Sequence, residues 1–391
     1  MRSFTRCVSA FVVGVTAWSS GIAQSTDPLA ANATPSAAEL TFSQMRSVSS
    51  PCIATRVAWS PDSQHFAVLG SQRNVCLHEQ RGARLIREMP LPWGTFQGGL
   101  AFSSEGDRLY VGDDQVHEFR VVDGQELKAF GGIAIGSDKF VPIKQLALSP
   151  DGKALVVDYL PLANSQIRTP EHLLIYDAAT GASQREIDLK GAGISTAVVF
   201  SPDGKSLYFA GSDQLLDSHG VRQVGALATR TLLRKVTLIT DQQQDVARDI
   251  HVMRPTALAT SASDRFAFTG TNTGAISDDL DTSSGKWVHT VNADPIRMFS
   301  LSDGSVQQTF SPVTGRVASL LPSASGNTLV SCQADMASSR TITVWDIKRG
   351  MPRYSIETPG SNRGPTMCAL SPDEKHLLYA VGKDIRIIDF Q

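Results

Sequence analysis

The sequence carries little excess charge of either sign. Its 36 Lys and Arg residues are nearly balanced by 38 Asp and Glu residues, and the formal net charge is −2. Proteins that bind nucleic acid or anionic lipid through a general electrostatic field need a clear surplus of basic residues. The composition therefore predicts that the chain has no nucleic-acid partner.

The short motifs of many enzyme active sites are also missing. The chain contains no G-x-S-x-G elbow, no H-E-x-x-H, no C-x-x-C, no C-x-x-C-H and no glycine-rich phosphate loop. The sequence thus assigns no catalytic residue, and it predicts neither a cofactor nor a metal site. A site assembled from residues far apart in the chain leaves no such motif, so an enzyme stays an alternative.

Long apolar runs are absent too. The apolar stretch Cys7–Trp18 is too short to span a bilayer comfortably. It follows Arg2 and Arg6 and precedes the small residues Gly21–Ala23, which is the order found in a secretory signal peptide. We expect residues 1–23 to be a signal peptide that is cleaved after Ala23. This predicts a periplasmic or secreted chain without an integral membrane segment; a non-cleaved anchor is the alternative.

What the sequence does contain is a repeated phrase. An alternating apolar stretch, a turn resembling Ser-Pro-Asp-Gly-Lys and a second apolar stretch recur along the chain. Seven copies begin at Val57, Leu100, Leu146, Val198, Leu258, Leu320 and Ala369. Pro, Asp and Gly favour tight turns, and the flanking runs are rich in Val, Leu, Phe and Tyr. Each copy therefore predicts a β-hairpin.

A second phrase follows most of these hairpins. It consists of an apolar run, an Asp and then a Gly, as in LLIYDAATGASQREI from Leu173 and ITVWDIKRGMPRYSI from Ile342. Each such phrase predicts a third strand, a tight turn and a fourth strand. Seven units of four antiparallel strands, none of which can cover both of its faces alone, predict an all-β, seven-bladed β-propeller.

The two ends of the chain complement each other. The last copy leaves room for only three strands, whereas Leu40–Val48 has the pattern of a strand without a hairpin of its own. An N-terminal strand that completes the last blade would close the ring and remove its exposed edges. We therefore expect the propeller over residues 39–391. Residues 24–38 are small, polar and without periodicity, and they are expected to form a disordered leader.

The hairpins and the VWD segment Val344–Asp346 resemble bacterial WD-repeat propellers, and IYDAATG from Ile175 is a looser version of the same strand end. The resemblance extends to secreted relatives: YVTN, Tol-system, lactonase and quinoprotein-amine-dehydrogenase-like propellers. The chain departs from the WD pattern because the usual Gly-His pair is absent and only one unit has a full Trp-Asp. The resemblance implies the fold and leaves the function open, since this architecture hosts very different activities.

Cysteine is scarce, with five residues in the chain. Cys7 lies in the predicted signal peptide, which leaves Cys52, Cys76, Cys332 and Cys368. An even number of cysteines in an oxidising compartment permits two disulfides. We expect the pairs Cys52–Cys76 and Cys332–Cys368, both near the seam where the ring closes. Buried free thiols are the alternative.

Binding residues of a propeller tend to lie in long connections held by its rigid scaffold. Five candidates fall in such predicted connections: Trp93, Phe96, Tyr159, Arg168 and Trp287. Aromatic side chains of this kind anchor partners at interfaces. Burial between blades is the alternative for Trp93, Phe96 and Trp287.

The predicted link Asp241–Arg254 adds four charged or titratable candidates. They are Arg248, Asp249, His251 and Arg254. Charged residues that alternate in a loop can place a His and a carboxylate together at the channel mouth, as an acid–base pair or a ligand clamp. A solvated loop with a local ion pair is the alternative.

The favoured function is that of a non-catalytic module in the cell envelope. It would bind a protein or peptide, or act as a scaffold, with an envelope or secreted protein as partner. The alternative is a propeller enzyme acting on a small molecule at the channel mouth, either a lactonase-like hydrolase or an amine-dehydrogenase-like subunit. A subunit that carries no site and holds a larger complex together is the third possibility.

Overall fold

The computed structural model describes most of the chain between Phe42 and Phe390. The described residues are 42–92, 98–134, 140–159, 172–189, 194–212, 231–252, 255–271, 294–313, 315–334, 339–359 and 367–390, with the backbone alone of 276–281 and 286–291. They form strands and no helix, and so contain no helix that could span a membrane. The predicted signal peptide and leader lie outside the described residues.

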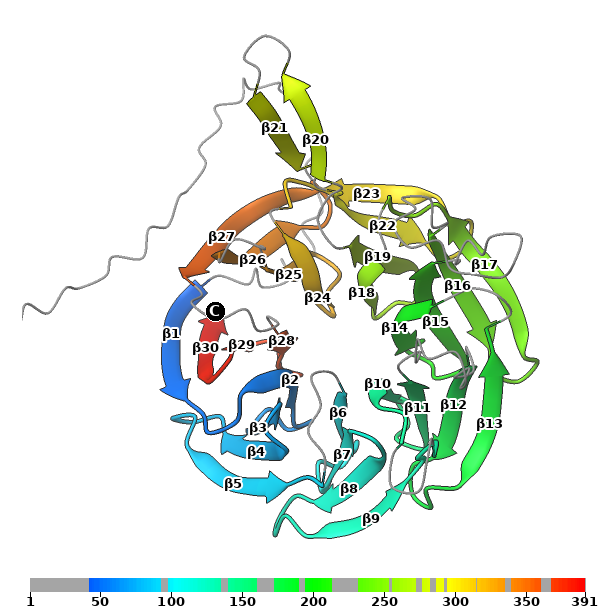
Figure 1. The fold of residues 1–391 in the computed structure, drawn as a ribbon, viewed down its shortest axis with the longest axis vertical. Helices are drawn as coiled ribbons and strands as arrows, with labels where there is room; N and C mark the ends of the chain where they lie inside the picture. The colour runs from blue at the N-terminus through cyan, green and yellow to red at the C-terminus, as the bar shows by residue number, and fades with distance from the viewer. Residues whose placement is uncertain are drawn as a thin grey trace, which may run out of the picture.

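Seven four-stranded antiparallel sheets stand in a ring, so the fold is the expected seven-bladed β-propeller (Figure 1). In the first four blades the strands follow chain order from the centre of the ring outward. Blade one is β2 (Ala54–Trp59), β3 (His65–Gly70), β4 (Asn74–Glu79) and β5 (Leu85–Pro90). Blade two is β6 (Gly99–Phe102), β7 (Arg108–Gly112), β8 (Val116–Arg120) and β9 (Glu126–Phe130). Blade three is β10 (Ile143–Leu148), β11 (Ala154–Tyr159), β12 (His172–Asp177) and β13 (Ser183–Asp188).

Blade five interrupts this order with an inserted hairpin. Blade four is β14 (Ile194–Phe200), β15 (Ser206–Ser212), β16 (Thr231–Thr237) and β17 (Gln242–Arg248). Blade five is β18 (Pro255–Thr260), β19 (Phe266–Thr271), β22 (Ile296–Ser300) and β23 (Val306–Phe310). The insertion forms a separate two-stranded sheet, β20 (Ile276–Asp281) and β21 (Lys286–Val291). Blade six is β24 (Arg316–Pro322), β25 (Thr328–Ala334), β26 (Ser339–Asp346) and β27 (Met351–Pro359).

Blade seven is built from both ends of the chain. Its strands are β28 (Met367–Leu370), β29 (His376–Val381), β30 (Asp384–Phe390) and β1 (Phe42–Ser49). β1 pairs antiparallel with β30, with Met45 opposite Ile388 and Val48 opposite Ile385. Figure 1 shows β1 beside β30 there, blue against red. The N-terminal strand therefore closes the ring, as the sequence predicts.

The core is divided among the boundaries between neighbouring blades. Seven clusters of buried apolar side chains occupy these boundaries, one for each pair of neighbours. Between blades five and six, for example, the rings of Phe310 and Trp345 pack edge to face with their centroids 5.8 Å apart. Burying one such side chain contributes about 1.5–3 kcal/mol. A blade without its neighbours would lose this burial on both faces. The stability of each blade therefore depends on the complete ring.

The two expected disulfides are both present. Cys52 and Cys76, with Cα atoms 6.0 Å apart, join the segment before β2 to β4 within blade one. Cys332 of β25 and Cys368 of β28, with Cα atoms 6.3 Å apart, join blade six to blade seven. Both disulfides therefore lie near the closure of the ring, in blades one, six and seven.

Candidate functional site

The candidate site lies where the innermost strands surround the centre of the ring (Figure 1). In five of them, a register shift near the first residues marks a β-bulge: β2, β10, β14, β18 and β24. A bulge bends its strand locally and turns a side chain to a new direction. The same irregularity thus recurs around the channel, at the end of the strands where the connections between blades enter.

Hydrogen bonds from side chains hold these innermost strands to one another. The Gln145 side chain of β10 donates to the Val198 carbonyl of β14 at 2.8 Å and accepts from the amide of the same residue at 3.3 Å. Thr256 of β18 donates through Oγ1 to the Val317 carbonyl of β24 at 2.6 Å. The channel wall is therefore fixed by more than packing, which suits a surface that must present side chains in a constant geometry.

Arg56 extends from β2 along this wall. Its guanidinium donates to the Thr55 carbonyl at 2.8 Å and to the Lys144 carbonyl at 3.2 Å. Lys144 belongs to blade three, so the Arg56 side chain reaches past blade two. The two backbone carbonyls fix the position of the guanidinium without neutralising its charge.

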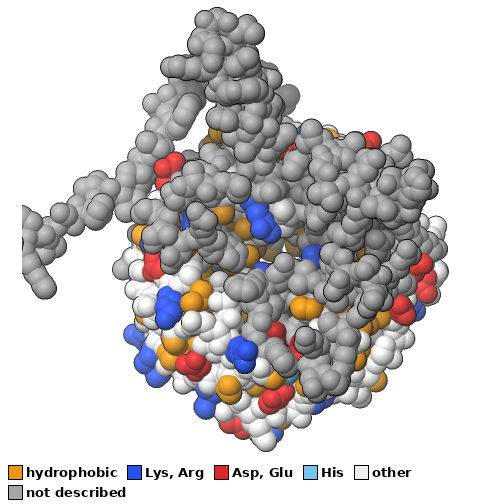
Figure 2. All heavy atoms as spheres, in the orientation of Figure 1, with side chains coloured by type: hydrophobic (Ala, Val, Ile, Leu, Met, Phe, Trp, Pro, Cys, Tyr) orange, Lys and Arg blue, Asp and Glu red, His pale blue; other side chains and the backbone are white. Residues whose placement is uncertain are grey.

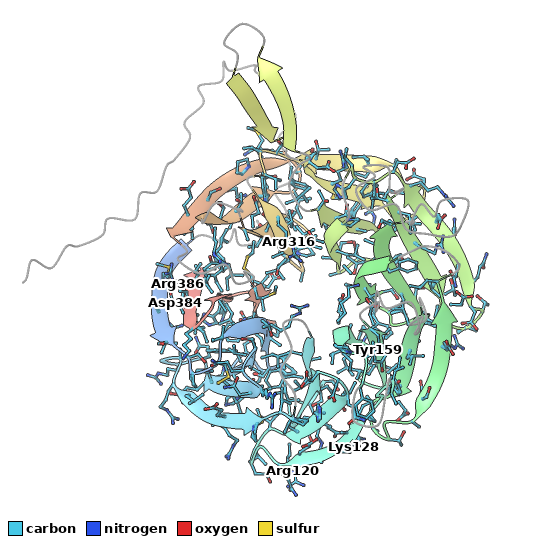
Figure 3. All side chains as sticks on the ribbon, viewed as in Figure 1. Arg120, Lys128, Tyr159, Arg316, Asp384 and Arg386 are labelled. Carbon is cyan, nitrogen blue, oxygen red and sulfur yellow. A yellow bond between two sulfur atoms is a disulfide. The ribbon has the colours of Figure 1, made fainter. Side chains whose placement is uncertain are left out.

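Arg316, the first residue of β24, lies at the inner edge of the ring (Figure 3). Its side chain is exposed, yet burial lowers the pKa of its guanidinium. The Arg316 side chain is therefore in contact with water but has protein on several sides, as in a recess. Figure 2 shows the middle of this face hollowed, with Lys and Arg side chains beside the hollow.

The two guanidinium groups act on each other. Burial, and after it the charge of Arg316, lower the pKa of Arg56 to about 10. Both groups therefore stay protonated at neutral pH while they repel each other. Among the described residues neither has a carboxylate partner in an ion pair. An anion placed beside both would relieve the repulsion.

The third basic residue of this wall is already neutralised. Lys144 pairs with Asp158 of β11 at 2.8 Å, and both side chains are largely buried. The net positive charge of the described channel wall thus rests on Arg56 and Arg316. Planar guanidinium groups bind carboxylates and phosphates through two parallel hydrogen bonds. The arrangement is suited to an anionic ligand.

His251 lies inside blade five. Its ring nitrogens lie 3.1 Å from Asp294 Oδ2 and 2.8 Å from Thr269 Oγ1, and its side chain is fully buried. Arg297 completes the group through a 2.8 Å ion pair with the other oxygen of Asp294. The carboxylate beside His251 is therefore Asp294, which lies 43 residues along the chain, and not the nearby Asp249.

The charges of this group follow from burial. Burial lowers the pKa of His251, so the ring is neutral at neutral pH. Burial alone would raise the pKa of Asp294, but the hydrogen bonds with His251 and with the Val252 amide, together with the charge of Arg297, outweigh it and lower that pKa. Arg297 Nη1 also lies 2.9 Å from His251 Nδ1, so this ring nitrogen contacts both Arg297 and Asp294, while Nε2 contacts the Thr269 hydroxyl. Both ring nitrogens thus have partners inside the protein. The arrangement is typical of a structural hydrogen-bond network.

Arg248 and Asp249 lie at the outer end of blade four. Residues 242–248 form its fourth strand, β17, where the sequence suggested part of a link. The sequence QQQDVAR is polar because the outermost strand has one face in water, and this polarity is also typical of a loop. Arg248 pairs with Asp245, which also pairs with Arg234 at 2.5 Å, and Asp249 is exposed with a positive φ of 52°.

Tyr159 ends β11 and is buried. Its hydroxyl bonds to the Gly131 carbonyl and lies 3.2 Å from the Tyr176 hydroxyl. Burial raises the pKa of both phenols. The hydrogen bond with Tyr176 raises the pKa of Tyr159 further. Figure 3 shows Tyr159 among the strands of blade three. Its phenol thus packs between blades two and three.

The remaining candidates are not placed by the structure. Trp93, Phe96, Arg168 and Arg254 lie outside the described residues. Trp287 belongs to strand β21 and not to a loop, and its side chain lies outside the described part of the structure. Their roles in binding stay predictions.

Sequence reasoning missed the residues that now stand out. Arg56 and Arg316 are isolated basic residues at the starts of strands, and no motif marks them. Asp113, Asp114 and His117 are the one group of His, Cys, Asp or Glu side chains, among the described residues, that has metal-ligand spacing. The only signal for them was the short run G-D-D-x-x-H at the end of a predicted hairpin.

Comparison with known proteins adds no relative. No protein-family model matches the chain, and no curated protein matches it. The propeller fold therefore rests on the structure alone, and the resemblance to WD-repeat and YVTN-like propellers stays a prediction.

Proposed function

We propose that this chain is an exported, non-catalytic binding module of the cell envelope, whose central channel takes an acidic segment of a protein or peptide partner. The observation that carries the proposal is the pair of guanidinium groups of Arg56 and Arg316. They come from blades one and six, face the same recess and lack a carboxylate partner among the described residues. Carboxylates of the partner would supply that missing charge.

The form of the ligand follows from the geometry. The two guanidinium groups come from different blades, one and six, so they offer a ligand two separate points of contact. An extended segment with two or more carboxylates can reach both, whereas a single carboxylate can engage one. Complementary charge of this kind contributes mainly to the rate and specificity of association.

Export is supported by independent features. Disulfides persist in oxidising compartments, and the structure contains two of them, Cys52–Cys76 and Cys332–Cys368. The N-terminal sequence has the order of a signal peptide. A periplasmic or secreted location agrees with both.

The proposal can be tested by affinity capture from envelope extract with the mature chain, residues 24–391, as bait. We expect a stoichiometric protein partner that Arg316→Gln weakens and that Arg56→Gln/Arg316→Gln abolishes. Arg349→Gln is the matched control, because Arg349 is exposed in the turn between β26 and β27, at the opposite end of the strands. Thermal unfolding of each variant checks that the ring is intact.

Two results would overturn the proposal. One is a partner that the double variant retains at full strength. The other is turnover of a lactone or an amine by the purified chain, which would favour the enzyme alternative. The Arg316 side chain makes no hydrogen bond to the part of the chain that the structure describes, so Arg316→Gln separates loss of binding from loss of folding.

A further inference from the structure

Blade two contains a cluster of titratable side chains that the channel does not use. Asp113 and Asp114 lie in the turn between β7 and β8, and His117 lies on β8. All three are buried, with 2%, 8% and 2% of their surface exposed. Burying carboxylates and an imidazole is costly unless they are paired or coordinate a metal ion.

The orientation of His117 is set by its outer neighbour. Its Nδ1 lies 2.8 Å from Glu126 Oε1 on the adjacent strand β9. A carboxylate only accepts, so Nδ1 donates its proton to Glu126, and Nε2 is the ring nitrogen that can bind a metal ion. Carboxylates hold metal-binding histidines in the same manner, because they fix the tautomer and raise the basicity of the ring.

The free nitrogen points into the cluster. His117 Nε2 and Asp114 Oδ1 are buried, make no hydrogen bond among the described residues, and lie 3.5 Å apart. A hydrogen bond between nitrogen and oxygen normally spans about 2.7–3.2 Å, so this separation is too long for one. Asp113 adds a carboxylate oxygen, and the three ligand atoms lie within 4.8 Å of one another.

The same separation fits two ligands of one metal ion. With each atom about 2.05 Å from the ion, 3.5 Å corresponds to an angle of about 117° at the metal, near the tetrahedral value. One imidazole nitrogen and two carboxylate oxygens suit zinc, which takes His and Asp ligands at this distance. Three protein ligands leave a fourth position for water.

We propose that Asp113, Asp114 and His117 bind a divalent transition metal, with Zn²⁺ as the fitting ion and Glu126 as the residue that positions His117. The site lies in blade two and is distinct from the guanidinium pair of the channel. Bound metal would join the β7–β8 turn to the outer strand β9 through His117 and Glu126. It would therefore stabilise this blade.

The test is Zn²⁺ binding by the full mature chain, treated with a chelator and then titrated in a calorimeter, with thermal unfolding in parallel. We expect one equivalent of Zn²⁺ and a rise in melting temperature. Asp114→Asn should abolish this binding. Glu126→Gln should weaken Zn²⁺ binding 10- to 100-fold. The Glu126 side chain is 42% exposed, so this substitution should not unfold the chain.

His376→Gln provides the matched control. His376 also donates from Nδ1 to a carboxylate, Asp389 at 2.8 Å, but its Nε2 already lies 3.1 Å from Gln80 Nε2. This variant should bind Zn²⁺ as the wild type does. The proposal is overturned if the wild type takes up no Zn²⁺. It is equally overturned if Asp114→Asn and Glu126→Gln bind Zn²⁺ unchanged, or if the cluster takes Ca²⁺ in preference to Zn²⁺.

Discussion

At the scale of single residues, the first turn of four blades is held by one arrangement of Ser and Asp. Ser201 donates to Asp203 Oδ1 at 2.6 Å and accepts the Ser206 amide at 2.9 Å, and Asp203 accepts the Lys205 amide at 3.0 Å. The same Ser–Asp bond, at 2.5–2.6 Å, recurs at Ser60–Asp62, Ser149–Asp151 and Ser371–Asp373. These bonds, first the one from Ser201, lower the pKa of the Asp203 carboxyl. In these four blades the repeated Ser-Pro-Asp phrase therefore provides the hydrogen bonds that close the hairpin.

Asp203→Ala is predicted to destabilise the chain by about 1 kcal/mol, because it removes one bond to a side chain and one to a backbone amide. Urea unfolding followed by fluorescence measures the change. Lys205→Ala is the control, since the Lys205 side chain is 71% exposed and its ammonium lies 3.9 Å from Asp203. An equal loss in both variants would show that the turn does not depend on the Asp.

The buried His251 predicts a specific pH dependence of stability. Its pKa in the folded chain is lower than the unfolded value of about 6.5. As the pH falls below that value the unfolded chain takes up a proton that the folded chain does not. The free energy of unfolding therefore decreases with falling pH in this range, by at most about 1.4 kcal/mol per pH unit for one proton.

His251→Gln should flatten this slope between about pH 6.5 and the lower folded pKa, in addition to weakening the fold. Asp294, whose pKa is lowered, stays charged through that range. The measurement is urea unfolding of both proteins at a series of pH values. His65→Gln, at a side chain that is 37% exposed, serves as control and should keep the wild-type slope. A slope unchanged by His251→Gln would contradict the assignment of a neutral buried ring.

At the scale of elements, β1 has the clearest role. It covers the edge of β30, and Arg46 of β1 bonds to Asp389 at 2.9 Å and to the Gln80 carbonyl of blade one at 3.1 Å. The strand thus joins the last blade to the first. An uncovered strand edge is a template for pairing with other chains.

Removal of residues 1–49 is predicted to expose β30 and to cause self-association or aggregation, with lower thermal stability. Light scattering after size-exclusion chromatography, with thermal unfolding, measures both effects. The control removes residues 1–41 and keeps β1. Equal behaviour of the two truncated chains would contradict closure by the N-terminal strand.

The elements also show what sequence patterns can and cannot predict. The hairpins and the closing strand were predictable because turn residues and alternating apolar residues act locally, and because the strand missing at one end was present at the other. β17 was not recognised, since an outermost strand such as Gln242–Arg248 is as polar as a loop. The partner of His251 was not predictable either, because Asp294 reaches it across the inserted hairpin β20–β21.

At the scale of the whole molecule, the ring brings together residues that no sequence window contains. Arg56 and Arg316 lie on strands of blades one and six, and the closed ring brings them close enough for the charge of Arg316 to lower the pKa of Arg56. Their convergence depends on the number of blades and on the bulges that turn side chains inward. The two charges therefore lie in one recess as a consequence of the fold.

The channel proposal is tested most directly by titrating a fluorescein-labelled peptide of eight Glu residues into the mature chain and recording its anisotropy. The account predicts saturable binding that weakens with salt, is weakened by Arg316→Gln, is lost in Arg56→Gln/Arg316→Gln and is unchanged in Arg349→Gln. A peptide of eight Lys residues should not bind. Acidic-peptide binding of equal strength in the wild type and the double variant, or no binding by the wild type at low salt, would contradict it.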